Sequence, residues 1–200
     1  SSAASDVYKR QKTYEVGVVS DLAYGALGYQ GYENPSFLST PGAKDVGIEF
    51  YTFSKTFNMA GWRLAFAAGN DQMIEALNLI QDHLFVGIFP ALQEAGIAAL
   101  LDPKSEEAVA QLNATYDGRR DAFVQAAAKI GWQAFPSRGS FYAWMPVPEG
   151  YTSESFADLL LEKVHVAVAP GKGFGPAGDA YVRIGLLVEP ERLVEAVNRI

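Results

Sequence analysis

The sequence contains no cysteine, which excludes disulfides, thiolate metal sites and thiol catalysis within its 200 residues. It has only two histidines, His83 and His165, and their wide separation argues against a histidine metal site. No apolar run reaches the roughly 18 residues that a helix needs to span a bilayer. Positive charge is scarce, because 16 Lys and Arg face 23 Asp and Glu, for a formal net charge of −7. We therefore expect no metal, no membrane and no nucleic-acid partner.

The fraction of hydrophobic residues is ordinary for a globular protein. Hydrophobic residues make up 49% of the chain, enough for a sizeable core in one large domain or two small ones. The opening segment, "SSAASDVYKRQ" at 1–11, lacks the apolar region of a signal peptide. It resembles the in-frame translation of a transposase adaptor used to prepare sequencing libraries. We expect 1–11 to be such an artefact and the natural chain to begin upstream, although a genuine tail is the alternative.

The first half of the chain predicts alternating strands and helices. Short runs rich in β-branched and aromatic residues predict buried strands at 16–24, 46–54 and 62–69. Apolar residues at helical spacing predict helices at 71–83 and 91–101, and Asp102-Pro103 precedes a long helix over about 104–129. This order is typical of an α/β domain with a mostly parallel sheet.

The pattern changes after Gly131. The stretches "WQAF" (132–135) and "SFYAWMPV" (140–147) predict strands separated by a turn, and their aromatic residues predict core packing. A helix follows over 153–165, with Ser153 as its N-cap. Then come a strand at 166–170, a glycine-rich loop at 171–179, a strand at 180–188 and a helix at 189–200. We predict two domains, α/β over 12–115 and a small α+β domain over 116–200.

The stretch "SKTFNMAGWR" places a lysine, Lys55, directly after a predicted strand. Open α/β sheets bind ligands at the carboxyl ends of their strands, so this lysine is a candidate for Schiff-base chemistry with an aldehyde. Arg63 could lower the lysine pKa as a nearby cation, and its fork suits a phosphate monoester. Ser54 and Thr52 offer hydroxyl donors to the same phosphate. A solvent-exposed lysine is the alternative for Lys55 taken alone.

Asp21 ends the first predicted strand at the same edge of the sheet. Its carboxylate could cap a turn, or it could keep a pyridine nitrogen protonated and so make the ring an electron sink. Tyr24, three residues later, could pack in the core or donate a hydrogen bond to a ring phenolate.

Together, "SDLAYGALGY", "SKTFNMAGWR" and "PGKGFGPAGDAYVRIGL" resemble the class I/II aminotransferases of fold type I, which use pyridoxal phosphate. The resemblance covers nearly all of 12–200 and points to the C-terminal half of such an enzyme, with transaminases of methionine salvage and diaminopimelate synthesis as the nearest kinds. It implies the C-terminal part of the large cofactor-binding domain followed by the small domain.

The resemblance also implies roles for individual residues. Lys55 would bind the cofactor covalently, Asp21 would pair with the pyridine nitrogen, and Tyr24 with the phenolic oxygen. Arg63 and Ser54, with Thr52, would bind the phosphate.

Arg183, inside the strand "YVRIGLL", would bind the substrate α-carboxylate. A charge in an apolar strand is costly unless it is paired, which supports that role and leaves an internal salt bridge as the alternative.

The implied reaction moves an amino group between an amino acid and a 2-oxo acid in a cytoplasmic homodimer. Other enzymes of the fold, such as lyases or synthases, remain alternatives, as does the cofactor-sensing domain of a transcription regulator. The family's upstream half supplies further pocket residues, so we expect this chain alone to be inactive.

Overall fold

A computed structural model describes residues 10, 11, 13–135 and 137–200, and the chain divides into two compact units. The first contains Glu33–Ala110 and the described residues before Tyr29, and the second contains Tyr29–Tyr32 and Gln111–Ile200. The division therefore falls within the long helix. Of the predicted adaptor segment, only Arg10 and Gln11 are among the described residues, and both are helical.

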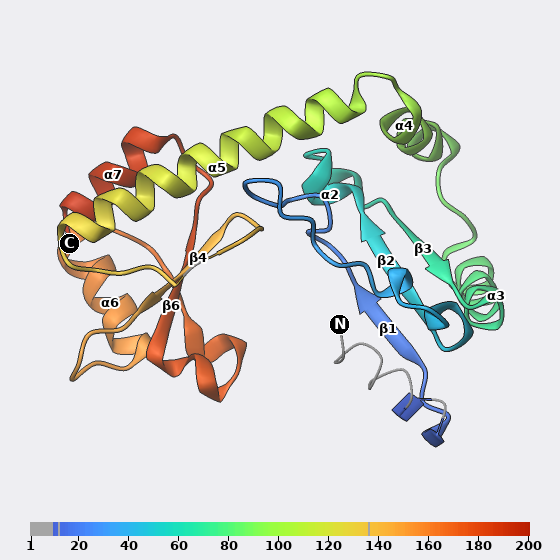
Figure 1. The fold of residues 1–200 in the computed structure, drawn as a ribbon, viewed down its shortest axis with the longest axis horizontal. Coiled ribbons are helices and arrows are strands. Elements are labelled where there is room, and N and C mark those ends of the chain that lie inside the picture. The colour runs from blue at the N-terminus through green and yellow to red at the C-terminus, as the bar shows by residue number, and fades with distance from the viewer. Residues whose placement is uncertain (1–9, 12, 136) are drawn as a thin grey trace. The chain divides into compact units, whose positions relative to one another are not determined.

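A three-stranded sheet organises the first unit, in the order β1 (Val18–Asp21), β2 (Gly47–Thr52), β3 (Ala65–Gly69), as Figure 1 shows. β1 and β2 are parallel, with Val18 opposite Gly47, and β3 is antiparallel to β2. The three predicted strands are confirmed, each shorter than expected. Because β1 and β2 run in the same direction, their carboxyl ends, Asp21 and Thr52, lie at one edge of the sheet.

The end of β3 requires a glycine. Gly69 has a φ of +143°, and a Cβ at this position would lie 2.3 Å from the carbonyl oxygen of Gly47 on β2. The next residue, Asn70, caps the following helix by accepting a hydrogen bond from the backbone N–H of Met73 at 3.1 Å. The Gly-Asn pair thus stops the strand and starts the helix.

The helices of the first unit are α2 (Phe53–Thr56), α3 (Asp71–Ile80), which continues as the π-helical turn η4 (Gln81–Phe85), and α4 (Pro90–Leu101). Short 3₁₀ turns connect them and the strands: η1 (Phe37–Ser39), η2 (Ala43–Asp45) and η3 (Ala60–Trp62).

The prediction that β1 is buried on both faces is wrong. Its residues alternate between half-buried and exposed, and the Val19 side chain is 63% exposed. Ile48, the partner of Val19 on the same face of β2, is only 5% exposed, so among the described residues the cover of this face reaches β2 but leaves Val19 on the edge strand exposed. Phe66 of β3 is also exposed. The alternation follows from the two-residue period of a strand.

The second unit is built from the part of α5 (Ser105–Lys129) that begins at Gln111, from α6 (Ser153–Val164) and α7 (Pro190–Asn198), and from an antiparallel sheet. The sheet has the order β4 (Tyr142–Pro146), β6 (Tyr181–Gly185), β5 (Ala169–Pro170). The glycine-rich segment forms two 3₁₀ turns, η5 (Gly171–Phe174) and η6 (Pro176–Ala180), between β5 and β6.

The two faces of this second sheet differ in chemistry. One face is the core, where side chains of β4 and β6 pack against α5, α6 and α7; its buried members include Ala143, Met145, Val182, Ile184, Phe123, Phe156, Leu160, Leu193 and Val197. The other face carries the half-buried side chains of Tyr142, Trp144, Tyr181 and Arg183. The expectation that the aromatics of this region form the core therefore holds for Trp132 and Phe141 but not for Tyr142 and Trp144.

Two further predictions are corrected here. The N-cap of α6 is Thr152, whose hydroxyl accepts from the backbone of Ser155 in a capping box, whereas Ser153 is fully buried as the first helical residue. The stretch "WQAF" is not a strand. Phe135 makes one backbone hydrogen bond to Trp144, and a single bond does not build a ladder.

Candidate active site

The predicted cofactor residues of the first unit gather around the carboxyl ends of β1 and β2. Asp21 is the last residue of β1 and Thr52 the last of β2. Lys55 follows in the single turn of α2, and Tyr24 lies in the turn after β1. Parallel pairing of the two strands therefore brings together residues that are about thirty positions apart in sequence.

The Lys55 amine lies over the Tyr24 ring. The Lys55 Nζ atom lies 5.9 Å from the centroid of the Tyr24 ring, at the outer limit of a cation–π contact. Both side chains are half-buried. An amine beside a phenol at the carboxyl edge of a sheet is an arrangement that can hold an aldehyde cofactor with a phenolic oxygen.

Two hydroxyl residues, Thr52 and Ser54, precede Lys55 at the start of α2. Thr52 caps α2 by accepting from the backbone N–H of Ser54 at 3.1 Å, and its Oγ1 donates to Ser54 Oγ at 2.9 Å. Ser54 Oγ acts as acceptor in that bond, so its own proton can be donated to a ligand. The Thr52 hydroxyl is used in hydrogen bonds within the turn, so Ser54 is the better candidate to donate a hydrogen bond to a ligand.

Arg63 lies outside this immediate cluster. Its side chain is exposed, its φ of 54° is left-handed, and its Nη1 donates to the carbonyl of Ala60 at 2.9 Å. Within the described part of the chain, no hydrogen bond joins Arg63 to Ser54. The next residue, Leu64, accepts from the backbone N–H of Phe53 at 3.2 Å, which ties the Arg63 backbone to the start of α2.

The exposed Asp21 carboxylate is followed by a turn that the sequence did not explain. Asn34 holds this turn, because its Nδ2 donates to the carbonyls of Tyr24 at 3.0 Å and Leu27 at 3.1 Å. No pattern in the sequence singled out Asn34 for this role. The only available signal was the Asn-Pro pair, which marks a turn but names no partner.

Glu49 is a second residue that sequence reasoning missed. This β2 carboxylate is only 7% exposed, yet three donors surround it: Ser20 Oγ at 3.0 Å, Ser36 Oγ at 2.6 Å and the backbone N–H of Phe37 at 2.7 Å. Ser20 is its partner across the strands and precedes Asp21. Glu49 thus fixes the loop around Ser36 to the sheet that carries Asp21.

Arg183 belongs to the second unit, where it sits in β6 opposite Trp144 of β4. Its Cζ atom lies 4.1 Å from the ring centroid of Tyr142 and 4.0 Å from that of Phe174. Among the residues that the structure describes, no carboxylate forms an ion pair with Arg183, so the internal salt bridge considered from sequence is not found. Its charge remains available to an anionic ligand.

Other kinds of site receive no support from the described chain. Across residues 10, 11, 13–135 and 137–200, no group of three His, Asp or Glu side chains could hold a metal ion. No helix among those residues has the length and apolar character needed to cross a membrane.

Comparison with known proteins decides the family. The family model described as aminotransferase class I and II matches residues 3–200. The chain belongs to the class I and II aminotransferase family. This family uses pyridoxal phosphate, and the fold is that of its fold type I members.

Individual proteins similar to this chain are aminotransferases too. It is 59% identical over 183 residues to the L-glutamine–4-(methylsulfanyl)-2-oxobutanoate aminotransferase of Bacillus subtilis, covering 92% of this chain and 46% of that protein. It is 45% identical to the LL-diaminopimelate aminotransferase of Moorella thermoacetica, covering 98% and 50%. The structure of apo-BacF from Bacillus subtilis matches with a TM-score of 0.92 and 42% identity, covering 98% and 50%. The chain therefore spans about half the length of these relatives.

The residues present fit the family's cofactor. An amine, a carboxylate and a phenol, from Lys55, Asp21 and Tyr24, match the aldehyde, the ring nitrogen and the phenolic oxygen of pyridoxal phosphate. The Ser54 hydroxyl and the Arg63 guanidinium match its phosphate.

Proposed function

We propose that the protein containing this chain is a pyridoxal-phosphate-dependent aminotransferase that moves an amino group between an amino acid and a 2-oxo acid. The observation that carries the proposal is the contact of Lys55 Nζ with the Tyr24 ring at the sheet edge that ends in Asp21. The family match gives this cluster its chemical meaning.

Each residue has one task in this proposal. Lys55 holds the cofactor covalently, Asp21 keeps the pyridine nitrogen protonated, and Tyr24 donates to the phenolic oxygen. When bound, the cofactor supplies an electron sink for the electron pair left at the substrate Cα after proton removal. The Lys55 amine would act as the general base that removes the proton from the substrate Cα and would carry that proton for its return.

The phosphate and the substrate are held by other side chains. Ser54 and Arg63 bind the phosphate, and Thr52 supports them by shaping the turn of α2. Arg183 binds the α-carboxylate of the substrate through its guanidinium fork. The lack of an ion-pair partner for Arg183 within the described residues supports this role, since a half-buried cation is stabilised by an anionic ligand.

The relatives indicate the kind of substrate and assembly. The names of the Bacillus subtilis and Moorella thermoacetica enzymes specify glutamine with a methylsulfanyl oxo acid, and diaminopimelate. We infer an amino acid and a 2-oxo acid of metabolism as substrates, a homodimer as the assembly and the cytoplasm as the location. The lyase and regulator alternatives are not favoured, because the relatives are named aminotransferases.

The test is covalent labelling of the full-length holoenzyme. Borohydride reduces the bond between the lysine and the cofactor aldehyde, and peptide mapping should locate the label on Lys55. Lys44, an exposed lysine of η2 in the same unit, serves as the internal control and should stay unlabelled. A label on a lysine other than Lys55 would overturn the assignment.

A second measurement separates transamination from lyase chemistry. The full-length holoenzyme is incubated with an amino acid, with and without a 2-oxo acid acceptor. An aminotransferase sustains turnover only with the acceptor, whereas a lyase releases product without it.

A further inference from the structure

The guanidinium of Arg183 is bordered by aromatic rings from two different elements. Tyr142 comes from β4, on the same sheet face as Arg183, and Phe174 comes from the η5 turn. The ring centroids lie 4.1 Å and 4.0 Å from Arg183 Cζ, close to optimal for cation–π attraction. We call these two side chains the aromatic clamp.

The aromatic clamp holds the cation without neutralising it. A carboxylate partner would occupy the N–H donors of the fork, whereas a ring in contact with the guanidinium leaves those donors able to bind a ligand. Since Arg183 has no ion pair among the described residues, the clamp is the main restraint on its charged end there. The guanidinium therefore keeps its full positive charge for binding a substrate carboxylate.

Phe174 owes its position to a tightly folded glycine-rich segment. A Cβ on Gly171 would lie 2.1 Å from the carbonyl oxygen of Gly178, and a Cβ on Gly178 would lie 2.1 Å from that of Gly171. The turns η5 and η6 therefore approach each other at a distance that only glycine permits. The Phe174 ring also meets Trp144 edge-to-face, at a centroid distance of 5.7 Å.

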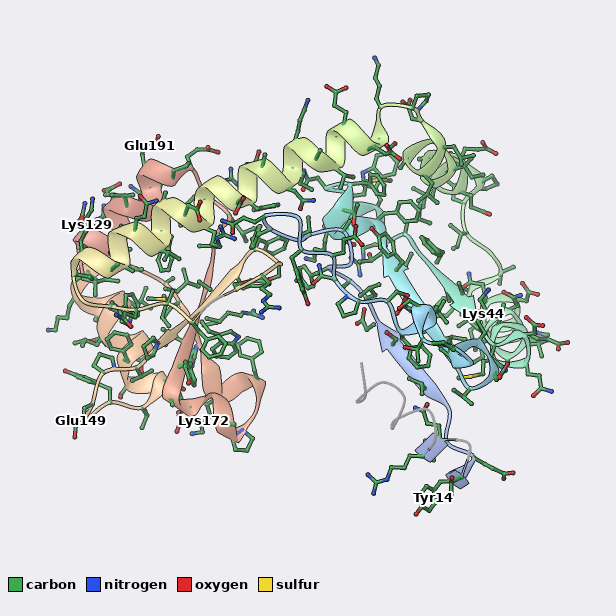
Figure 2. The ribbon with its side chains drawn as sticks, viewed as in Figure 1. Tyr14, Lys44, Lys129, Glu149, Lys172 and Glu191 are labelled. Atoms are coloured by element: carbon green, nitrogen blue, oxygen red, sulfur yellow. The ribbon has the colours of Figure 1, made fainter. Side chains whose placement is uncertain are left out.

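A buried polar network fixes this segment to the start of α6. Ser153, which is fully buried, donates its hydroxyl to Asp179 Oδ1 at 2.8 Å and accepts the backbone N–H of Lys172 at 3.2 Å. Hydrogen bonds from Ser153 lower the pKa of Asp179. The Lys172 side chain, labelled in Figure 2, pairs with Glu154 at 2.7 Å on the surface. Both ends of the segment that carries Phe174 are thus anchored.

We propose that Tyr142 and Phe174 are positioning residues for substrate binding: they orient the Arg183 guanidinium so that its fork meets the substrate carboxylate. This inference rests on the proposed role of Arg183. In this proposal the clamp acts through Arg183, which both rings contact. Its loss should therefore weaken carboxylate binding while the chemical step is largely preserved.

The test measures carboxylate binding without turnover. A 2-oxo acid cannot react with the aldehyde form of the full-length holoenzyme, so calorimetric titration of that form reports binding alone. The primary amide of the same oxo acid lacks the charge and serves as the reference ligand. The variants are Phe174→Leu, Phe174→Tyr and Tyr142→Leu. Phe135→Leu is the matched control, because Phe135 lines the same cavity as Phe174, whereas the rings over Arg183 are those of Tyr142 and Phe174.

We expect Phe174→Leu and Tyr142→Leu to raise the Kd of the oxo acid about three- to tenfold, the range of a partly desolvated cation–π contact. KM should rise by a similar factor, with kcat within about twofold of the unchanged enzyme. Phe174→Tyr should retain affinity, since its ring is preserved. The amide should bind all of these variants equally, and Phe135→Leu should behave like the unchanged protein.

The outcomes separate the clamp from the function on which it rests. If Arg183→Lys abolishes oxo-acid binding while both leucine variants keep the original Kd, the clamp is refuted and the role of Arg183 stands. If Arg183→Lys leaves the Kd unchanged, the assignment of Arg183 fails and the clamp fails with it. Equal losses for the oxo acid and its amide would mean a merely structural role and would also refute the clamp.

Discussion

Replacing Glu49 with alanine should loosen the loop around Ser36, which follows the turn that contains Tyr24. The carboxylate is 7% exposed and accepts from Ser20, Ser36 and the backbone of Phe37. The two serine hydroxyls can rotate toward other acceptors, but the Phe37 N–H cannot. One buried amide left without a partner costs about 1–3 kcal/mol, and two weakened hydroxyl bonds add about 1 kcal/mol each, so the expected loss is about 3–5 kcal/mol.

Glu49→Gln provides the sharper comparison. Its remaining oxygen can occupy the position of Oε2 and accept from Phe37 and Ser20, while its amide group donates to Ser36 Oγ. All three partners then stay hydrogen-bonded, and only the charge assistance is lost, at about 1 kcal/mol. The two variants of one residue should thus differ by about 2–4 kcal/mol.

Hydrogen exchange at the Phe37 amide of the full-length protein measures this difference directly. Since about 1.4 kcal/mol corresponds to a factor of ten, Glu49→Ala should speed local exchange by roughly two to four decades and Glu49→Gln by less than about one. Glu75→Ala, at an exposed position on α3, is the control and should change nothing at Phe37. Equal exchange rates in the Gln and Ala variants would refute this account of the network.

Two further outcomes are expected. Asp21→Ala should lower kcat of the full-length enzyme by about two decades, because the charge partner of the ring nitrogen is lost. Lys129→Ala, at the end of α5 (Figure 2), is the control and should leave kcat unchanged. Equal kcat values in the two variants would contradict the role of Asp21. Burial raises the pKa of Tyr29 to about 12 despite the nearby Arg120. Because the Tyr29 pKa is higher in the folded than in the unfolded protein, its contribution to the free energy of unfolding is fully present below about pH 10 and is lost as the pH rises toward 12. The free energy of unfolding should therefore fall more steeply with pH over this range than it does in Tyr29→Phe. If stability falls with pH equally in the unchanged protein and in Tyr29→Phe, the raised Tyr29 pKa is contradicted.

Local sequence patterns were sufficient for most of the secondary structure. The spacing of apolar residues placed α3, α4 and α5, and β-branched runs placed β1 and β2, because these patterns reflect the period of the backbone itself. Capping was less certain: Ser153 and Thr152 are both N-cap residue types, and only the fold showed that Ser153 is buried against Asp179.

The sequence by itself also determined the family, since the short motifs that contain Lys55, Asp21 and Tyr24 resemble those of the class I and II aminotransferases, and the family model matches residues 3–200. The roles of these three residues stay predictions. Only the tertiary structure decided what surrounds them. Glu49 meets Ser20 through the pairing of β1 with β2, and Arg183 meets Tyr142 through the pairing of β4 with β6 and Phe174 through the fold of the glycine-rich turns. The physical reason is that sheet register and close backbone packing bring together residues far apart in sequence, and no local pattern encodes which of them will touch.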